Sequence, residues 1–115
     1  MSYTILTAKQ AAHLQPEKFC MPPKAAVQML VPGNLVLIMV DYINKTSGRP
    51  QAEPIWCVVL RRKKDKLVVA VWPDPPPKKM MHHGIMPKTL LTVTLNNILD
   101  IRFEAEAPKK EFKII

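Results

Sequence analysis

The side chains best suited to chemistry are cationic, and the densest group of them lies between residues 61 and 79. Seven Lys and Arg residues stand there against two Asp: Arg61, Arg62, Lys63, Lys64, Lys66, Lys78 and Lys79. Across all 115 residues, 17 basic and 9 acidic side chains give a formal net charge of +8. A basic surface concentrates polyanions and gains salt-dependent affinity from each phosphate that it neutralises. The group therefore indicates either a surface for an acidic partner or a turn that only keeps the chain soluble.

A second notable segment, residues 80–86, combines adjacent histidines with methionines. Such side chains suit a soft or borderline metal, but His82 and His83 would point in opposite directions on an extended chain, and a site needs three or four ligands. The other soft ligands show no ligand spacing: His13, Cys20 and Cys57. We therefore expect no metal and no cofactor. We interpret His82 and His83 as part of a long, proline-rich loop over residues 73–88 that contacts a partner, because methionines adapt to varied surfaces.

Catalytic motifs are absent from the sequence. There is no glycine-rich phosphate loop and no pair of carboxylates at a catalytic spacing. A nucleophilic pair would need Cys20 or Cys57 beside a histidine of the 80–86 segment, and nothing in the sequence places them together. Cys57 lies within an apolar run and is interpreted as a small core residue. We expect a protein that is not an enzyme, with a small metal-dependent or Cys/His enzyme as the lesser alternative.

The expected elements are short because 12 prolines divide the chain. Thr7 is a predicted N-cap for the first helix, and Pro22-Pro23 opens the second, whose Val27, Met29 and Leu30 should pack onto the core. Capping and periodicity predict helices at 8–14 and 24–30, a strand at 35–42, a hairpin of 55–62 with 66–72, and a strand at 89–95. The last predicted element, at 98–103, is a short strand or a 3₁₀ turn followed by a strand. The expected fold is α+β, with two short N-terminal helices packed on a strongly bent five-stranded antiparallel sheet or small β-barrel.

Length and hydropathy predict one domain. It divides into an N-terminal helical segment (1–30), a β core (31–104) and a C-terminal tail or edge strand (105–115). The longest apolar runs have six residues, too few to span a membrane, and the first residues do not read as a signal peptide. With two cysteines, this predicts reduced thiols and a cytoplasmic protein. Phe112, Ile114 and Ile115 could pair with a second copy, so a homodimer is a further hypothesis.

Trp56 and Trp72 flank the predicted hairpin at similar distances from its tip, which makes them expected cross-strand neighbours. They could be core residues or a stacking platform beside the basic tip. Aromatic residues form only 6% of the chain, which favours a protein partner over a nucleic-acid backbone. We therefore expect a protein-interaction module that binds an acidic surface, with nucleic-acid binding as the alternative. The predicted contact residues are Arg61, Arg62, Lys63, Lys64, Lys66, Trp72, Lys78, Lys79, His82 and His83.

A series of short motifs between Lys18 and Ile101 follows an order found elsewhere. The motifs are Phe19–Lys24, Leu30–Ile38, Glu53–Val59, Val71–Pro75 and Ile98–Ile101. In order and spacing they resemble small bacterial proteins of domain-of-unknown-function family 2314. Asn34 stands where that family has Asp, and Pro73 where it has Asn. The resemblance implies a fold and carries no activity.

Overall fold

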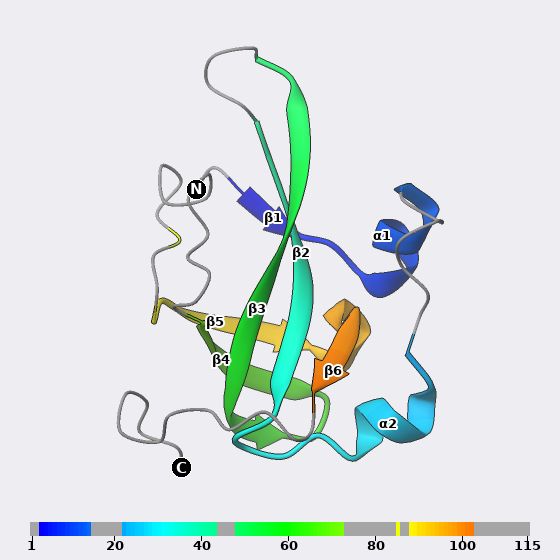
Figure 1. Ribbon diagram of the computed structural model, residues 1–115, viewed down its shortest axis with the longest axis vertical. Coiled ribbons are helices and arrows are strands. Elements are labelled where there is room, and N and C mark those ends of the chain that lie inside the picture. Colours follow the sequence, from blue (N-terminus) through cyan, green and yellow to red (C-terminus); the bar gives the residue numbers. More distant parts are fainter. Residues whose placement is uncertain (1–2, 15–21, 44–47, 73–84, 86–87, 103–115) are drawn as a thin grey trace.

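The computed structural model describes residues 3–14, 22–43, 48–72, 85 and 88–102, which form two helices, a 3₁₀ turn and one antiparallel sheet (Figure 1). The elements are β1 (Tyr3–Ile5), α1 (Ala8–Leu14), α2 (Lys24–Gln28), β2 (Leu35–Ile43), β3 (Pro50–Lys63), β4 (Lys66–Val71), β5 (Leu90–Thr94), η2 (Leu95–Asn97) and β6 (Asp100–Arg102). None of these helices is long and apolar enough to cross a lipid bilayer.

The sheet curls into a nearly closed barrel. Its strand order is β1-β2-β3-β4-β5, and β6 returns from η2 to pair with β2. The second half of β2 pairs with β1 and its first half pairs with β6, as the partners Tyr3↔Tyr42 and Leu35↔Arg102 show. Two helices and a barrel-like antiparallel sheet confirm the predicted α+β class. The prediction missed β1, because three residues carry no clear alternation and this strand is defined by its pairing with a distant segment.

Side chains alternate between the two faces of the strands and so form separate apolar clusters. Inward-facing residues of β2 to β5 fill the barrel, together with Val27, Leu30 and Ile85. A second cluster lies on the outer face of the sheet and comprises Leu35, Val58, Leu60 and Ala70, with Trp56 and Trp72 packed against it. Ala8 and Ala11 of α1 form a third cluster with Met39 of β2. β2 is therefore buried on both faces, as its unbroken apolar run predicts.

Local signals set where both helices begin. Gln10 N–H donates to Thr7 Oγ1 (3.1 Å) and Thr7 N–H donates to Gln10 Oε1 (2.9 Å), a reciprocal cap that confirms Thr7 as the N-cap of α1. α2 begins after Pro23, as predicted, but ends at Gln28 rather than at residue 30. Its last turn tightens, because Met29 and Leu30 donate to carbonyls only three residues back (3.1 and 3.3 Å).

Candidate functional site

The candidate site is built on the turn that joins β3 to β4. Only Lys64 and Asp65 separate the two strands, which confirms the predicted hairpin. Lys64 has a φ of +56°, in the left-handed region that tight hairpin turns require and that a lysine adopts at a conformational cost. β3 continues to Lys63, so the cationic residues before the turn stand on a strand and are held by its ladder of hydrogen bonds.

A β-bulge at Leu60 decides which way these cations point. Val59 pairs with Val69, and Arg61 pairs with Val68, so Leu60 is an extra residue in β3. The alternation restarts after the bulge. Arg61 and Lys63 therefore share the outer face of the sheet with Leu60, while Arg62 belongs to the opposite face.

Four cations at the hairpin tip are accessible to a partner: Arg61, Lys63, Lys64 and Lys66. All four side chains are exposed, and within the described ranges none forms an ion pair or a hydrogen bond. Asp65 is the one acid in the turn. The tip therefore presents uncompensated positive charge to solvent, which attracts anionic surfaces.

Arg62 has a different role from its neighbours. Its Nη1 donates to the carbonyl oxygens of Gln28 (2.7 Å) and Leu30 (3.0 Å), and its Nε donates to the Lys64 carbonyl (3.0 Å). These bonds connect the hairpin to the carboxyl end of α2, where a cation is favourable. The sequence analysis grouped Arg62 with the partner contacts; in the structure its guanidinium forms hydrogen bonds with the protein's own backbone.

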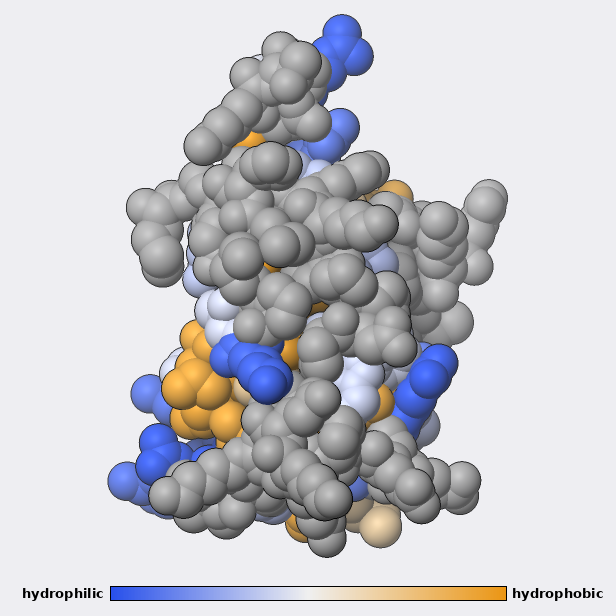
Figure 2. All heavy atoms as spheres, turned by 60° about the vertical axis from the view of Figure 1, so that its left-hand side comes forward, coloured by the Kyte–Doolittle hydropathy of each residue, from blue (hydrophilic) through white to orange (hydrophobic). Residues whose placement is uncertain are grey.

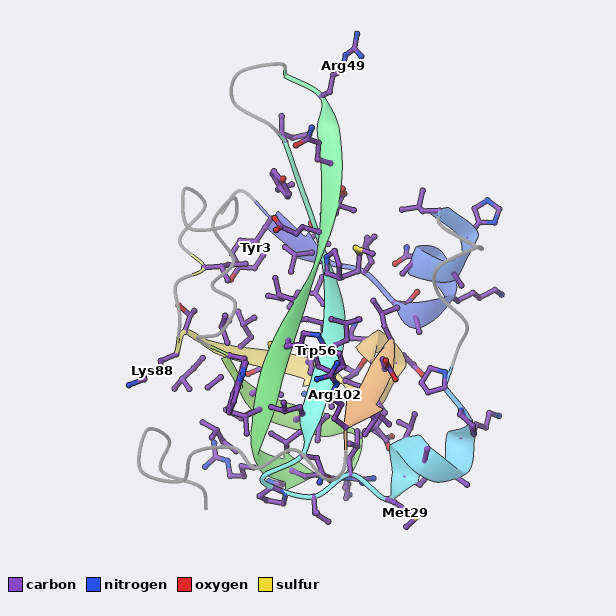
Figure 3. All side chains as sticks on the ribbon, viewed as in Figure 1. Tyr3, Met29, Arg49, Trp56, Lys88 and Arg102 are labelled. Carbon is purple, nitrogen blue, oxygen red and sulfur yellow. The ribbon has the colours of Figure 1, made fainter. Side chains whose placement is uncertain are left out.

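Met29 differs from the sequence expectation. It was predicted to pack onto the core with Val27 and Leu30, yet its side chain is 68% exposed, whereas Val27 and Leu30 are buried. The early end of α2 explains the difference, because the tightened last turn rotates Met29 away from the buried side. Figure 3 shows Met29 at the outer edge of the molecule beyond α2.

The two tryptophans are cross-strand neighbours, as predicted. Trp72 N–H donates to the Trp56 carbonyl (2.8 Å), and both side chains are half-buried against the outer cluster. The Arg102 guanidinium carbon lies 4.6 Å from the centroid of the Trp56 ring (Figure 3). One face of Trp56 is thus covered by a cation–π contact, which sequence reasoning missed because Arg102 lies on a distant strand.

Cys57 is a buried core residue, as predicted. It has no exposed surface, and desolvation raises the pKa of its thiol, so the nucleophilic thiolate is suppressed at neutral pH. Within the described residues, no group of three His, Cys, Asp or Glu side chains is placed to hold a metal ion. The remaining residues of interest lie outside the described part of the chain: Cys20, Lys78, Lys79, His82 and His83.

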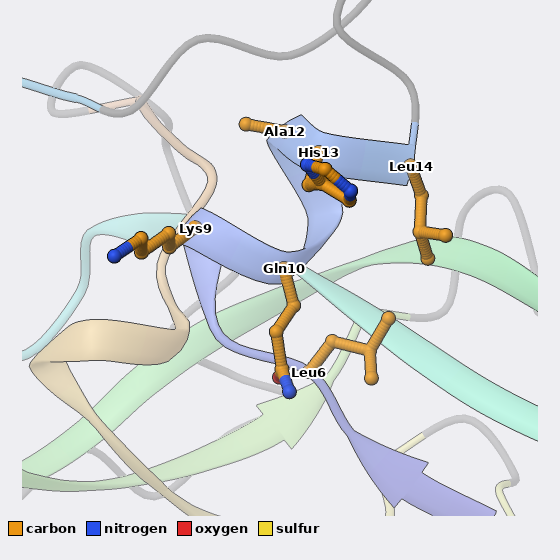
Figure 4. A pocket seen from close by; sticks show the side chains of 6 residues that line it. All are labelled: Leu6, Lys9, Gln10, Ala12, His13 and Leu14. Carbon is orange, nitrogen blue, oxygen red and sulfur yellow. The ribbon is translucent and has the colours of Figure 1, made fainter.

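A shallow hollow beside α1 offers no organised chemistry (Figure 4). Its lining is Leu6, Lys9, Gln10, Ala12, His13 and Leu14. Figure 4 shows Leu6 and Gln10 approaching each other while Ala12 points away from them, so the hollow follows the short helix and does not enclose a set of convergent groups.

Apolar residues also reach the surface in several places. In the view of Figure 2, hydrophobic atoms emerge low on the molecule with hydrophilic side chains beside them. Among the described residues, the large apolar side chains that are exposed are Leu14, Met29, Val31, Ile43 and Leu90. Met29 and Val31 flank Leu30, whose carbonyl Arg62 binds. The backbone between these two residues is therefore joined to the hairpin by Arg62.

Comparison with known proteins adds no functional identity. No family model matches the chain, and no similar curated protein or solved structure was found. The resemblance to family 2314 stays a prediction, and a functional conclusion rests on the geometry of the hairpin tip.

Proposed function

We propose that this protein is a non-enzymatic interaction module that binds an acidic surface of a partner protein through the tip of the β3–β4 hairpin. The contact residues are Arg61, Lys63, Lys64 and Lys66. One observation carries the proposal. All four side chains are exposed and form no ion pair within the described chain, and the hairpin that holds them is part of the barrel. The proposed contacts also include four residues of the 73–88 loop: Lys78, Lys79, His82 and His83. Trp72 is a further proposed contact, at the far end of the same outer face of the sheet.

A rigid cationic tip suits this role physically. Complementary charge raises the rate of encounter and selects among partners, while a fixed backbone reduces the entropy lost on binding. Arg62 supports the tip from within the fold and is therefore excluded from the proposed contact set.

A nucleic-acid backbone is the second candidate, favoured by the net charge of +8 and by the tryptophans on the same sheet face as Arg61 and Lys63. A protein partner is preferred because the Arg102 guanidinium already occupies one face of the Trp56 ring. Single-strand binders need free aromatic faces on which successive bases can stack.

The test is quantitative capture of proteins from a cell lysate by three forms of the protein: the wild type, Lys63→Glu with Lys64→Glu, and a control with Lys9→Glu and Lys24→Glu. The control reverses two exposed lysines outside the hairpin and outside the 73–88 loop, and it changes the net charge by the same amount. We expect acidic proteins to be recovered by the wild type and the control and lost from the tip variant. Identical recovery by all three forms would refute the proposal.

The nucleic-acid candidate is tested in parallel by gel retardation of mixed DNA and RNA fragments. Retardation at low salt that falls steeply as salt is added would support it, because phosphate contacts release counterions. Absence of retardation at micromolar protein would eliminate it.

A further inference from the structure

The segment between α2 and β2 carries two exposed apolar side chains, and its backbone lies close to the cationic tip. Met29 is 68% exposed and Val31 is 54% exposed, whereas Leu30 between them is only 1% exposed. Leu30 is thus an anchor in the core, and its two neighbours face solvent. Isolated exposed apolar residues are common on proteins, so the position of this pair matters more than its exposure.

Arg62 fixes that position. One guanidinium binds the carbonyl oxygens of Gln28 and Leu30 on one side and of Lys64 on the other. The backbone of the α2–β2 segment and the backbone of the hairpin turn therefore lie within the span of a single arginine head group. Figure 1 shows α2 and the connection that follows it at the same end of the molecule as the end of β3.

A tight turn, residues 31–34, fixes the end of the segment that leads into β2. Asn34 N–H donates to the Val31 carbonyl (3.2 Å), and Val31 N–H donates to Asn34 Oδ1 (2.9 Å). Pro32 and Gly33 occupy the turn centre, and Gly33 has the φ of +99° that a type II turn requires there. Gly33 N–H also donates to the Val59 carbonyl (2.8 Å), which joins the turn to β3. Val31 is therefore presented by a preorganised backbone.

We infer that the partner is an acidic amphipathic segment of a protein, whose apolar side chains contact Met29 and Val31 while its carboxylates contact the hairpin tip. This inference rests on the proposed function and adds the class of partner. We call the combined area the α2–hairpin surface: Met29, Val31, Arg61, Lys63, Lys64 and Lys66. Charge complementarity selects the acidic partner, and a flexible methionine beside a fixed valine suits apolar side chains of differing shape.

Charge alone is an incomplete description of how a partner would bind the α2–hairpin surface. Exposed ion pairs contribute little affinity, because water and salt screen them. Burying apolar area adds favourable free energy that salt does not screen. A partner that makes both apolar and charged contacts therefore keeps part of its affinity at high salt. A partner that makes only charged contacts is released at the same salt concentration.

Fluorescence anisotropy with two synthetic peptides tests the inference. The peptides have equal length and net charge. One contains only Glu and Ser, and the other has Leu and Phe in place of the Ser. Both are titrated with the wild type, with Met29→Ser plus Val31→Ser, and with Leu14→Ser plus Leu90→Ser. The last form is the matched control, because Leu14 and Leu90 are 59% and 63% exposed and lie outside the α2–hairpin surface.

We expect the wild type and the matched control to bind the apolar-acidic peptide about ten-fold more tightly than the Glu/Ser peptide. Met29→Ser plus Val31→Ser should reduce that preference to near unity and leave the binding of the Glu/Ser peptide unchanged. Unfolding by urea confirms that each variant folds, and substitutions at these exposed positions should leave the midpoint in place.

The possible failures are distinguishable. If Met29→Ser plus Val31→Ser keeps the full preference of the wild type, or if the wild type has no preference, the inference is wrong and the proposed function stands. If Lys63→Glu with Lys64→Glu binds both peptides as tightly as the wild type, or if the wild type binds neither, the proposed function fails and the inference fails with it.

Discussion

Tyr42 and Cys57 show how burial within the barrel controls single side chains. Tyr42 faces inward from β2, and its hydroxyl donates to Gln51 Oε1 (3.1 Å). Burial raises the pKa of Tyr42 above its ordinary value of 10.0, and the Glu53 carboxylate raises it further. Burial alone raises the pKa of Cys57 above its ordinary value of 9.0. In both cases the folded state favours the neutral form.

These shifts predict a loss of stability at alkaline pH. At neutral pH both groups are protonated in the folded and the unfolded chain. As the pH rises past 9.0 and then 10.0, the unfolded chain releases protons that the folded chain retains, so unfolding becomes more favourable. We expect the free energy of unfolding in urea to be lower at pH 10.5 than at pH 7.5. Cys57→Ala should weaken this pH dependence, and equal stability of the wild type at the two pH values would contradict the prediction.

Glu53 offers a separate test of the same residues. Its Oε2 atom is buried and has no hydrogen-bond partner among the described residues, and its charge contributes to the raised pKa of Tyr42. Glu53→Gln should therefore lower the pKa of Tyr42, because it removes the negative charge that disfavours the phenolate. The measurement is an ultraviolet titration of tyrosine in a Tyr3→Phe background. Asp41→Asn, on the opposite strand face, is the control and should leave the Tyr42 pKa unchanged.

The sequence predicted some of these residues and could not have predicted others. Cys57 lies in an unbroken apolar run, so its burial follows from its immediate neighbours. The role of Arg62 does not, because its acceptors Gln28 and Leu30 are 34 and 32 residues away in the chain. Nothing in the run of cations distinguishes Arg62 from Arg61 until the fold brings α2 beside the hairpin.

At the scale of elements, local patterns predicted the helices and strands better than they predicted the orientation of side chains. The Thr7 cap, the apolar run of β2 and the two hairpin arms are signals contained within a few residues. The bulge at Leu60 is a mismatch between two strands, which neither strand shows by itself. Because it shifts the alternation by one residue, it determines which cations of the candidate site face outward.

The contact between the β3–β4 hairpin and α2 depends on Arg62, and this dependence can be tested. Replacing it with Met should lower the free energy of unfolding by about 1–2 kcal/mol, because carbonyls at the end of α2 lose a charged donor. Arg62→Lys should recover only part of this loss, since one ammonium group cannot span the separate carbonyls that the guanidinium binds. Urea unfolding measures both variants.

Arg61→Met is the matched control for Arg62, because Arg61 is the adjacent exposed cation and its side chain forms no hydrogen bond or ion pair in the described chain. It should change stability by less than about 0.5 kcal/mol. Equal destabilisation by Arg61→Met and Arg62→Met would show that general loss of positive charge, and not the connection to α2, is responsible.

At the scale of the whole molecule, the barrel joins segments that are far apart in sequence. β6 returns to β2, Asn97 Nδ2 donates to the Leu6 carbonyl (3.0 Å), and Leu99 N–H donates to the Leu37 carbonyl (2.8 Å). The sequence predicted a closed sheet only on a general ground: a sheet of short, curved strands that closes into a barrel leaves no strand edge exposed. Which strands meet depends on these long-range contacts, and that explains why β1 was missed while the barrel itself was expected.

Ile85 joins the connection between β4 and β5 to this closed core. The sequence analysis interpreted that connection as a partner-contacting loop, yet Ile85 has no exposed surface and belongs to the cluster inside the barrel. The connection is also held where it rejoins the sheet, because Lys88 N–H donates to the Val71 carbonyl (2.8 Å) and Val71 N–H donates to the Thr89 carbonyl (2.9 Å). At least one residue of the proposed loop therefore contributes to stability.

Ile85→Ala should accordingly destabilise the protein by about 2–4 kcal/mol, since it removes a buried side chain and leaves a cavity. Ile85→Val, which removes one methylene, should cost about 1 kcal/mol. Leu90→Ala is the control of similar chemistry at a 63% exposed position and should cost less than about 0.5 kcal/mol. Urea unfolding distinguishes these values. If Ile85→Ala and Leu90→Ala unfold at the same urea concentration, Ile85 does not belong to the core in solution, and the 73–88 connection is free to act wholly as a contact loop.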